Sequence, residues 1–420
     1  MVEGRASTAD PSRLLVLGAG PAQLGLLAAA KAHGLYVIAA DRDPAAPGFR
    51  YADRRAIISA EDGPGIDRLA AAERVDGIIA PGIDWPVGIA ARAAERLGVP
   101  HPILPASAAL STSKLRQRER FAAAGVPHPR YAVCASESDA LEAAEYFGYP
   151  CVVKAPDRQG QRGLSLVEDA AAVPEAVEGA LAASRAGAFL IEELIAGREV
   201  TVNAFSIAGR FHPLTVTDRE TAEPPAFGVA LAHVWRSSLE PAQVGAAVQV
   251  AAAAAEAVGI ADGPTYTQVL VPADGEERPL VGELAARLGG GHDAELCQAA
   301  LGVDLNGLAL AAALGEEVDE SAVEPVARVG GACVRFLVAP PGELARVEGL
   351  AAARAVEGVL GVRVYRRRGH VFGELRHGSD RAGAVLAVGD SREEALERAA
   401  RAADFLRFTT VAEAVTQPRS

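Results

Sequence analysis

Residues 279–292 read PLVGELAARLGGGH, and the prediction of the fold starts from this stretch. An apolar run leads to Glu283, Arg287 follows four residues later, and three glycines at 289–291 then leave the backbone without side chains. Because side chains on a strand alternate between its faces, Glu283 and Arg287 are predicted to share a face. A carboxylate and a guanidinium beside a glycine loop suit a metal ion and an anion. The alternative interpretation is a strand end with a surface salt bridge.

Size and charge restrict the classes of function. The 420 residues are 50% hydrophobic, which predicts two to three domains with ample core. With 41 basic and 54 acidic residues, the formal net charge is −13. Nucleic acids and anionic membrane surfaces bind basic patches, so neither is an expected partner.

Cysteine spacing and apolar runs indicate the compartment. The four cysteines show no C-x-x-C spacing, which predicts free thiols in a reducing compartment and no zinc site. The N-terminal residues lack the apolar core of a secretory signal. The longest apolar run, 246–258, contains polar residues and is too short to span a bilayer. A soluble, cytoplasmic protein is therefore expected.

The first hundred residues predict a parallel, doubly wound sheet. Apolar runs at 13–17 and 36–40 flank an Ala-rich helical segment, and a second round of strand and helix follows up to Leu97. The glycines of 18–25 suit either a nucleotide phosphate, with Asp41 on a ribose, or only a tight turn. Gln23 stands where the dinucleotide fingerprint needs its third glycine, which favours the turn.

The next region carries two lysines of interest. A helix is predicted over 107–125 and contains Lys114, whose alternative role is a solvated helix face. A hairpin is predicted from 149–155 and 164–167, with Lys154 on its first strand and a loop rich in glycine and arginine at its tip. A cation beside a donor-rich loop suits a polyphosphate. The alternative is an ordinary hairpin with a charged tip.

Strands and helices alternate irregularly through the rest of the chain. Strands are predicted over 188–195, 200–207, 210–217, 264–271 and 279–284, a helix over 240–258, and a turn over 273–278. His233 lies in an apolar run and fits either a core histidine or a catalytic one. The last hundred residues predict a small α+β unit for packing, oligomerisation or covering the site, with strands near 330–338, 361–366, 371–376 and 382–389 and helices at 343–345 and 391–406.

In chain order, four motifs resemble those of the ATP-grasp superfamily of carboxylate–amine ligases. They are SKL at 113–115, YPCVVK at 149–154 with its glycine loop, LIEELIAGRE at 190–199 and ELAARLGG at 283–290. The resemblance covers nearly the whole chain and is strongest to the L-amino-acid ligases that form dipeptides, whose C-terminal domain the tail VGDSREEA at 388–395 looks like.

The resemblance implies an α/β, ATP-grasp fold in three parts. Residues 1–105 would form an N-terminal Rossmann-like domain with a parallel sheet. Residues 106–325 would form the ATP-grasp domain, with a lid subdomain over about 134–192. Residues 326–420 would form a small C-terminal α+β domain.

The resemblance also implies the roles of site residues. ATP and Mg²⁺ would be the cofactors, an amino acid and an amine the substrates, and a homodimer the assembly. The residues that would contact the phosphates, adenine and ribose of the nucleotide are Lys114, Lys154, Gly160, Gly163, Glu192, Glu193, Ile195 and Glu199. Glu283 and Gln268 would face the metal. Arg287, with Gly290 and Gly291 nearby, would orient the substrate carboxylate, and His233 would lie on the substrate side.

Two departures from the family pattern bear on activity. Gln268 stands where the superfamily carries a metal-binding carboxylate, and Ala285 stands where it carries asparagine. A neutral amide is a weaker magnesium ligand than a carboxylate, so one ion is expected to bind well and a second poorly. The leading hypothesis is a ligase that forms an amide through an acyl phosphate. The alternatives are another ATP-grasp branch, purine-pathway or carboxyphosphate-forming, and a catalytically silent nucleotide-binding subunit.

Overall fold

The N-terminal region forms a parallel sheet with helices on both faces. The computed structural model describes residues 10–273 and 278–411. The sheet has the order β3-β2-β1-β4 with every pair parallel, which confirms the doubly wound prediction. Its elements are β1 (Arg13–Leu17), α1 (Leu24–Ala32), β2 (Tyr36–Ala40), β3 (Arg54–Ala56), α2 (Gly63–Glu73), β4 (Gly77–Ile79) and α3 (Trp85–Leu97).

Alternate residues of β1 build two separate cores. Leu15 and Leu17 belong to the cluster that contains residues of α2 and α3. Leu14 and Val16 belong to the cluster on the other face, with residues of α1 and of α10 (Leu305–Ala313). This strand is buried on both faces, which explains its uninterrupted apolar sequence.

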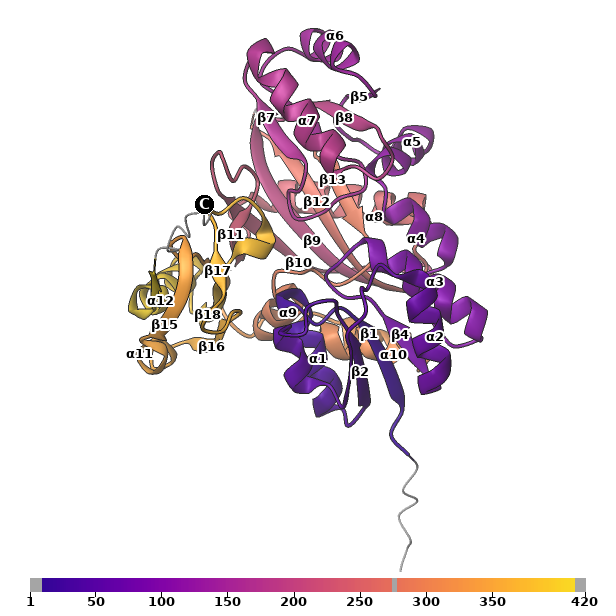
Figure 1. The fold of residues 1–420 in the computed structure, drawn as a ribbon, viewed down its shortest axis with the longest axis vertical. Helices are drawn as coiled ribbons and strands as arrows, with labels where there is room; N and C mark the ends of the chain where they lie inside the picture. Colours follow the sequence, from indigo (N-terminus) through magenta and orange to yellow (C-terminus); the bar gives the residue numbers. More distant parts are fainter. Residues whose placement is uncertain (1–9, 274–277, 412–420) are drawn as a thin grey trace, which may run out of the picture.

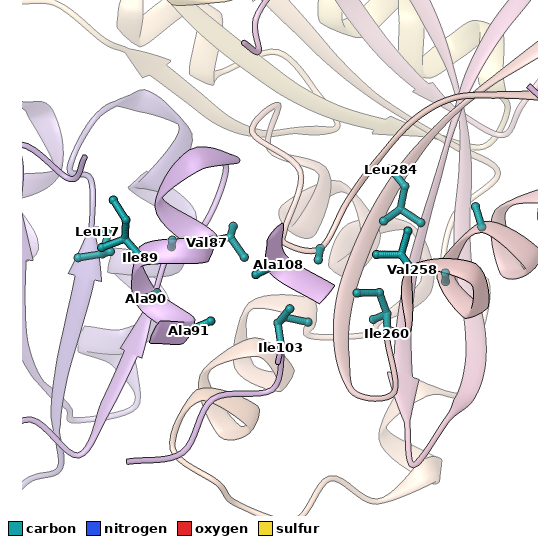
Figure 2. Close-up of a cluster of buried hydrophobic side chains, with 14 of the residues drawn as sticks. Leu17, Val87, Ile89, Ala90, Ala91, Ile103, Ala108, Val258, Ile260 and Leu284 are labelled. Carbon is teal, nitrogen blue, oxygen red and sulfur yellow. The ribbon is translucent and has the colours of Figure 1, made fainter. Parts of the chain in front are cut away.

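The core continues from the N-terminal sheet into the next region. Figure 2 shows Val87 and Ile89 of α3 on one side and Ile260 and Leu284 on the other, with Ile103 of the connecting segment between them. All of these side chains are buried. The two regions therefore share one continuous apolar core.

The helix predicted over 107–125 is two helices. α4 (Pro105–Ser111) ends before Thr112, and α5 (Lys114–Ala124) begins after Ser113. Ser113 has extended backbone angles, and its hydroxyl accepts a hydrogen bond from the amide of Arg116 at 3.4 Å. A serine N-cap thus restarts the helix, and it makes Lys114 the first helical residue.

A four-stranded antiparallel sheet stands apart at the top of Figure 1. Its order is β5-β8-β6-β7, and α6 and α7 pack on it through a small apolar cluster. The predicted hairpin is present as β6 and β7. The elements are β5 (Tyr131–Cys134), α6 (Glu137–Phe147), β6 (Cys151–Lys154), β7 (Leu164–Val167), α7 (Val173–Ala183) and β8 (Phe189–Glu193).

The largest sheet has eight strands in the order β13-β12-β9-β10-β11-β14-β18-β16, and every pair is antiparallel. α8 packs against β12 and β13. The elements of its first part are β9 (Gly197–Ile207), β10 (Arg210–Thr221), β11 (Ala230–Trp235), α8 (Pro241–Val258), β12 (Gly263–Pro272), β13 (Leu280–Ala285), α9 (Asp293–Leu301) and α10.

The C-terminal region extends this sheet and adds a second, three-stranded one. β14, β18 and β16 continue the eight-stranded sheet beyond β11, so hydrogen bonding crosses the proposed boundary near residue 325. The smaller sheet has the order β17-β15-β19. The elements are β14 (Gly331–Leu337), β15 (Gly342–Glu348), α11 (Leu350–Arg354), β16 (Val359–Val364), β17 (Val371–Phe372), β18 (Gly383–Gly389), α12 (Arg392–Phe405) and β19 (Arg407–Val411).

Two predictions for the C-terminal region were wrong. Residues 343–345 lie in the strand β15 and pair with β19, because only Leu344 of this stretch is buried and its neighbours alternate outward. The strand predicted over 371–376 is only two residues long. The predicted turn at 273–278 falls largely outside the described residues. In the part of the chain that the structure covers, no helix has the length and apolarity needed to cross a membrane.

Candidate active site

Two adjoining cavities lie between the sheets. The first, called the hairpin cavity, has a volume of about 220 Å³ and is lined by residues of the β6–β7 hairpin, β8 and β13. The second, called the glycine cavity, has a volume of about 370 Å³, and its wall includes Gly18, Gly82, Gly290 and Gly291. Residues 159–162, Tyr266, Gln268 and Arg287 line both cavities, so the two meet there.

A buried ion triad forms one wall of the hairpin cavity. Glu192 of β8 accepts a hydrogen bond from Arg118 Nε at 2.9 Å, and its other oxygen lies 2.5 Å from Lys154 Nζ of β6. Arg118 and Glu192 are buried. Burial lowers the pKa of Lys154 to about 8, although the Glu192 carboxylate opposes that change. The Glu192 carboxylate, expected near adenine, is therefore held by two cations.

A second ion pair faces this triad. Lys114 Nζ lies 2.9 Å from Glu283 Oε1 and also donates to the carbonyl of Arg158. Burial would raise the pKa of Glu283, but the charge and hydrogen bond of Lys114 hold it below its usual value. Gln268 of β12 stands directly opposite Glu283 of β13 in the register of the sheet. The residues expected near the metal therefore lie side by side.

The metal expectation can be tested against these donors. Among the described residues, no group of three or more His, Cys, Asp or Glu side chains is arranged to hold a metal ion. Glu283 supplies one carboxylate and Gln268 one amide oxygen. Magnesium is often bound by one or two carboxylates together with substrate phosphates. The donor set fits an ion that is delivered with a phosphate ligand, and does not form a site by itself.

The remaining residues expected at the nucleotide also line the hairpin cavity. Glu193 of β8 is paired with Arg130 at 2.6 Å, and Glu193 and Ile195 both lie on the cavity wall. Glu199 of β9 is paired with Arg219 of β10. The structure thus brings together on one cavity every lysine and glutamate proposed for the nucleotide.

The loop at 157–163 joins three parts of the molecule. The amide of Asp84, at the start of α3, donates to the side-chain oxygen of Gln159. The amide of Gly378, in the C-terminal region, donates to the carbonyl of Gly160 at 3.3 Å. Gly160 and Gly163 have positive φ, and a Cβ at Gly163 would lie 2.7 Å from Ala183. The loop therefore forms the partition between the two cavities.

Arg287 lies where the cavities meet. Its guanidinium is paired with Asp84 at 2.6 Å and lies 5.3 Å from the ring centre of Tyr266. Burial raises the pKa of the Asp84 carboxyl, against the charge of Arg287. The two residues are 203 positions apart in the chain. Glu283 and Arg287 both line the hairpin cavity, but β13 ends at Ala285, so Arg287 lies beyond the strand on which the two were predicted to share a face.

His233 is held by an aspartate that sequence reasoning missed. Its Nδ1 lies 2.9 Å from Asp293 Oδ1, and the other oxygen of Asp293 accepts from the amide of Gly291 at 3.1 Å. Burial would raise the pKa of Asp293, but His233 and these hydrogen bonds lower it to about 2. An ionised carboxylate can only accept a hydrogen bond, so Nδ1 of His233 must carry the proton of this contact. Nε2 takes no part in the contact with Asp293.

Glycine at 291 allows this arrangement. A Cβ there would lie 2.4 Å from the His233 ring and 3.2 Å from Phe336, while a Cβ at Gly290 would lie 3.1 Å from the carbonyl of Gly82. Any side chain at Gly291 would have to displace the histidine. Gly290 and Gly291 therefore let neighbouring elements approach closely, and together they form part of the wall of the glycine cavity.

Sequence signals for some missed residues were present. Arg118 stands four positions after Lys114 on one helix, so both point to the same side. Asp84 follows the buried strand β4, at the carboxyl edge of a parallel sheet where ligand sites lie. Nothing in the local pattern around Asp293 indicated a buried contact with His233.

Two family models match the chain. The carbamoyl-phosphate synthase L chain, ATP-binding domain matches residues 114–321, and the L-amino acid ligase C-terminal domain 2 matches residues 335–411. The chain belongs to the ATP-grasp carboxylate–amine ligase family. The first model includes Lys114, Lys154, Glu283 and Arg287 of the hairpin cavity. The second includes β15 to β19 of the C-terminal region.

Two curated relatives show how far the likeness extends. The protein y4rH of Sinorhizobium fredii is 30% identical over 311 residues, which cover 72% of this chain and 62% of that protein. A formate-dependent phosphoribosylglycinamide formyltransferase of Ignicoccus hospitalis is 28% identical over 97% of this chain and 98% of the relative. The chain thus matches under two thirds of y4rH but nearly all of the formyltransferase.

Solved structures confirm the ATP-grasp fold. The L-amino acid ligase of Bacillus licheniformis superposes with a TM-score of 0.80 at 21% identity, covering 96% of this chain and all of the other. N5-carboxyaminoimidazole ribonucleotide synthetase of Thermotoga maritima gives 0.73 at 20% identity, covering 95% and 100%. At these identities the likeness establishes the fold, and the substrates are a matter for proposal.

Proposed function

We propose that this ATP-grasp ligase joins the carboxylate of an amino acid to an amine, using ATP and releasing ADP and phosphate. The observation that carries the proposal is the meeting of two cavities at Arg287 and Gln268. One cavity holds two buried lysines, which suits a polyphosphate. The other is lined by glycine backbone and cationic side chains, which suits a small carboxylate.

On the nucleotide side, Lys114 and Lys154 would contact the phosphates, and the loop with Gly160 and Gly163 would cover them. The wall from Glu192 to Ile195 would meet adenine, and Glu199 the ribose. Mg²⁺ would supply charge neutralisation at the phosphates, with Glu283 as its anionic protein ligand and the Gln268 oxygen beside it. These roles fit the positions of the side chains on the hairpin cavity.

The proposed chemistry has two steps. A carboxylate oxygen of the substrate bonds to the γ-phosphorus and ADP leaves, giving an acyl phosphate. The amine nitrogen then bonds to the acyl carbon, phosphate leaves, and the nitrogen loses a proton. Arg287 would orient the carboxylate, and His233 Nε2 would accept the proton because Nδ1 is committed to Asp293. Positioning and charge neutralisation would supply most of the rate enhancement.

The organisation of the protein in the cell is also a proposal. We infer the divisions 1–105, 106–325 and 326–420, with a lid over about 134–192 that the separate four-stranded sheet supports. A homodimer in the cytoplasm is proposed. One solved neighbour, a biotin carboxylase domain of Hydrogenobacter thermophilus, is described as a dimer.

The decisive experiment is a screen of nucleotide products. Amino acids, singly and in pairs, should cause release of ADP and phosphate, and bicarbonate alone should not. Release of AMP and pyrophosphate would reject the acyl-phosphate route. Dependence on bicarbonate or formate instead of amino acids would favour another ATP-grasp branch, and no turnover with any substrate would favour a silent subunit.

Removal of one lysine tests the nucleotide side. Lys154→Ala should abolish ADP release and weaken ATP binding by about 2–3 kcal/mol, since one charge-assisted contact is lost. The matched control is Lys31→Ala, because Lys31 forms an exposed pair with Asp53 and lines neither cavity. Retention of full activity by Lys154→Ala would show that the lysine serves only the buried triad.

A further inference from the structure

Arg381 differs from Arg118, Arg219 and Arg287, the paired arginines at the two cavities. It follows the short turn η5 (Gly378–Asp380) and lines the glycine cavity. Its Nε donates to the Gly378 carbonyl at 2.7 Å, one terminal nitrogen donates to the Ala230 carbonyl at 3.3 Å, and the Phe336 ring centre lies 3.7 Å from its central carbon. No carboxylate within residues 10–273 and 278–411 forms an ion pair with it.

Three other arginines at the two cavities have a carboxylate partner. Arg118 is paired with Glu192, Arg219 with Glu199 and Arg287 with Asp84. Burial lowers the pKa of the Arg381 guanidinium and the nearby charge of Arg219 adds to that effect, while Tyr365 and the Asp293 carboxylate oppose it without forming an ion pair. A half-buried charge without a counter-ion is costly, so a ligand that supplies one gains correspondingly.

Contacts on both sides hold the Arg381 side chain in place. Phe336 lies against the guanidinium, and the same phenyl ring meets the His233 ring edge to face, with ring centres 5.4 Å apart. Two backbone carbonyls fix the guanidinium in its plane. A pre-oriented fork loses little entropy when an anion binds.

Arg381 and Arg287 differ in which cavities they line. Arg287, Gln268 and Tyr266 line both cavities, whereas Arg381 and His233 line the glycine cavity alone. An anion at Arg381 is therefore separate from the carboxylate that Arg287 would orient. One small molecule within a cavity of about 370 Å³ can reach both arginines.

Few free carboxylates balance the cations of this cavity. Its lining contains two acidic residues, Asp41 and Glu61. Asp41 accepts hydrogen bonds from the amides of Ala19 and Asp43, and Glu61 is paired with Arg185. The glycine cavity is thus cationic within a chain of net charge −13.

We propose that the substrate of the glycine cavity carries a second anionic group, a carboxylate or a phosphate, in addition to the carboxylate that reacts, and that Arg381 binds this group. The inference rests on the proposed ligase function for the reacting carboxylate. The guanidinium fork matches both carboxylate and phosphate geometry, so an acidic amino acid, another dicarboxylate and a phosphorylated acid share the chemistry.

The test measures binding by titration calorimetry in the presence of Mg²⁺ and a non-hydrolysable ATP analogue. Three ligand pairs differ by one anion: L-glutamate and L-glutamine, O-phospho-L-serine and L-serine, glutarate and butyrate. At least one acidic member should bind roughly tenfold or more tightly than its neutral partner, as expected for a charge-assisted bidentate contact. Which pair shows the difference identifies carboxylate or phosphate as the second anion.

Variants locate the effect. Arg381→Gln should remove the difference between pair members, Arg381→Lys should retain part of it, and the exposed neighbour Arg376 should be dispensable, so Arg376→Gln should behave as wild type. Equal melting temperatures of the variants exclude misfolding as the cause. Equal binding of all pair members by the wild-type protein, or no binding of any, would overturn the inference, as would discrimination that survives in Arg381→Gln.

Parallel ADP-release assays separate this inference from the proposed function. Discrimination that depends on Arg381 without ADP release would leave the anion site standing and reject the ligase. ADP release with neutral substrates, without discrimination, would do the reverse.

Discussion

The two cavities differ in whether the cations discussed here already have carboxylate partners. In the hairpin cavity, each lysine already has a carboxylate: Lys114 has Glu283, and Lys154 has Glu192. In the glycine cavity, Arg381 has none among the described residues. A polyanion entering the first cavity must draw the lysines away from existing partners, whereas an anion entering the second supplies a missing partner. The lysines of the hairpin cavity are therefore neutralised when the cavity is empty, whereas an anion bound in the glycine cavity would neutralise Arg381.

The largest expected effect concerns the carboxylate of the first cavity. Glu283→Gln should abolish ADP release at any magnesium concentration, since it removes the anionic ligand and the partner of Lys114. Gln268→Glu should lower the magnesium concentration needed for half-maximal rate, because it adds a carboxylate opposite Glu283. Magnesium titrations of ADP release compare the three proteins.

Each outcome of that titration has a clear meaning. An unchanged curve for Gln268→Glu beside an inactive Glu283→Gln would place Gln268 away from the metal. Wild-type activity of Glu283→Gln would remove the metal from this cavity altogether.

A second prediction compares a paired with an unpaired arginine. Arg118→Met leaves the buried Glu192 with Lys154 alone and should lower the free energy of unfolding by about 3–5 kcal/mol. Arg381→Met removes no ion pair and should cost much less. Denaturant unfolding of both variants measures the contrast. Equal losses of stability would show that Arg381 is a structural residue.

The smallest predicted effect is a pH dependence of ATP binding. The pKa of Lys154 in the empty protein is about 8, so the side chain loses its charge as pH rises through that value. Phosphates stabilise the charged form, so binding above pH 8 takes up a proton and the affinity falls as pH rises. At pH 9 the loss should be up to roughly tenfold relative to pH 7.

Calorimetry in buffers of different ionisation enthalpy measures this proton uptake directly. Lys154→Arg is the control, because arginine does not titrate in this range. An ATP affinity that is independent of pH between 7 and 9 in the wild-type protein would contradict the role given to Lys154.

The parts of the fold that depend on local pattern were predicted from the sequence. The β1–α1–β2 opening, the β6–β7 hairpin and the positions of β12 and β13 follow from apolar runs and turn residues a few positions apart. The N-cap at Ser113 was missed because a continuous helical pattern hides it. The strand β15 was missed because its pairing with β19 is not visible from residues 343–345.

Long-range partners decided what could not be predicted at the site. The motifs placed Lys114, Lys154 and Glu283 on one cavity, as their order in the chain indicated. The ion pairs around these residues could not be predicted, because Arg118 and Glu192 are 74 positions apart in the chain and Arg287 and Asp84 are 203 apart. Such pairs depend on how the sheets stack, which periodicity along the chain does not encode. The lack of a partner at Arg381 is also visible only in three dimensions.

The close packing around Gly291 has a consequence for how this protein can diversify. A side chain there would collide with His233 and Phe336, so this wall of the glycine cavity is closed to variation. The turn that precedes Arg381 also lines the glycine cavity, is more exposed, and should accept substitutions with less effect on the histidine. Changes of substrate range, in nature or in the laboratory, should therefore accumulate on the turn at 377–381 while the three glycines stay unchanged.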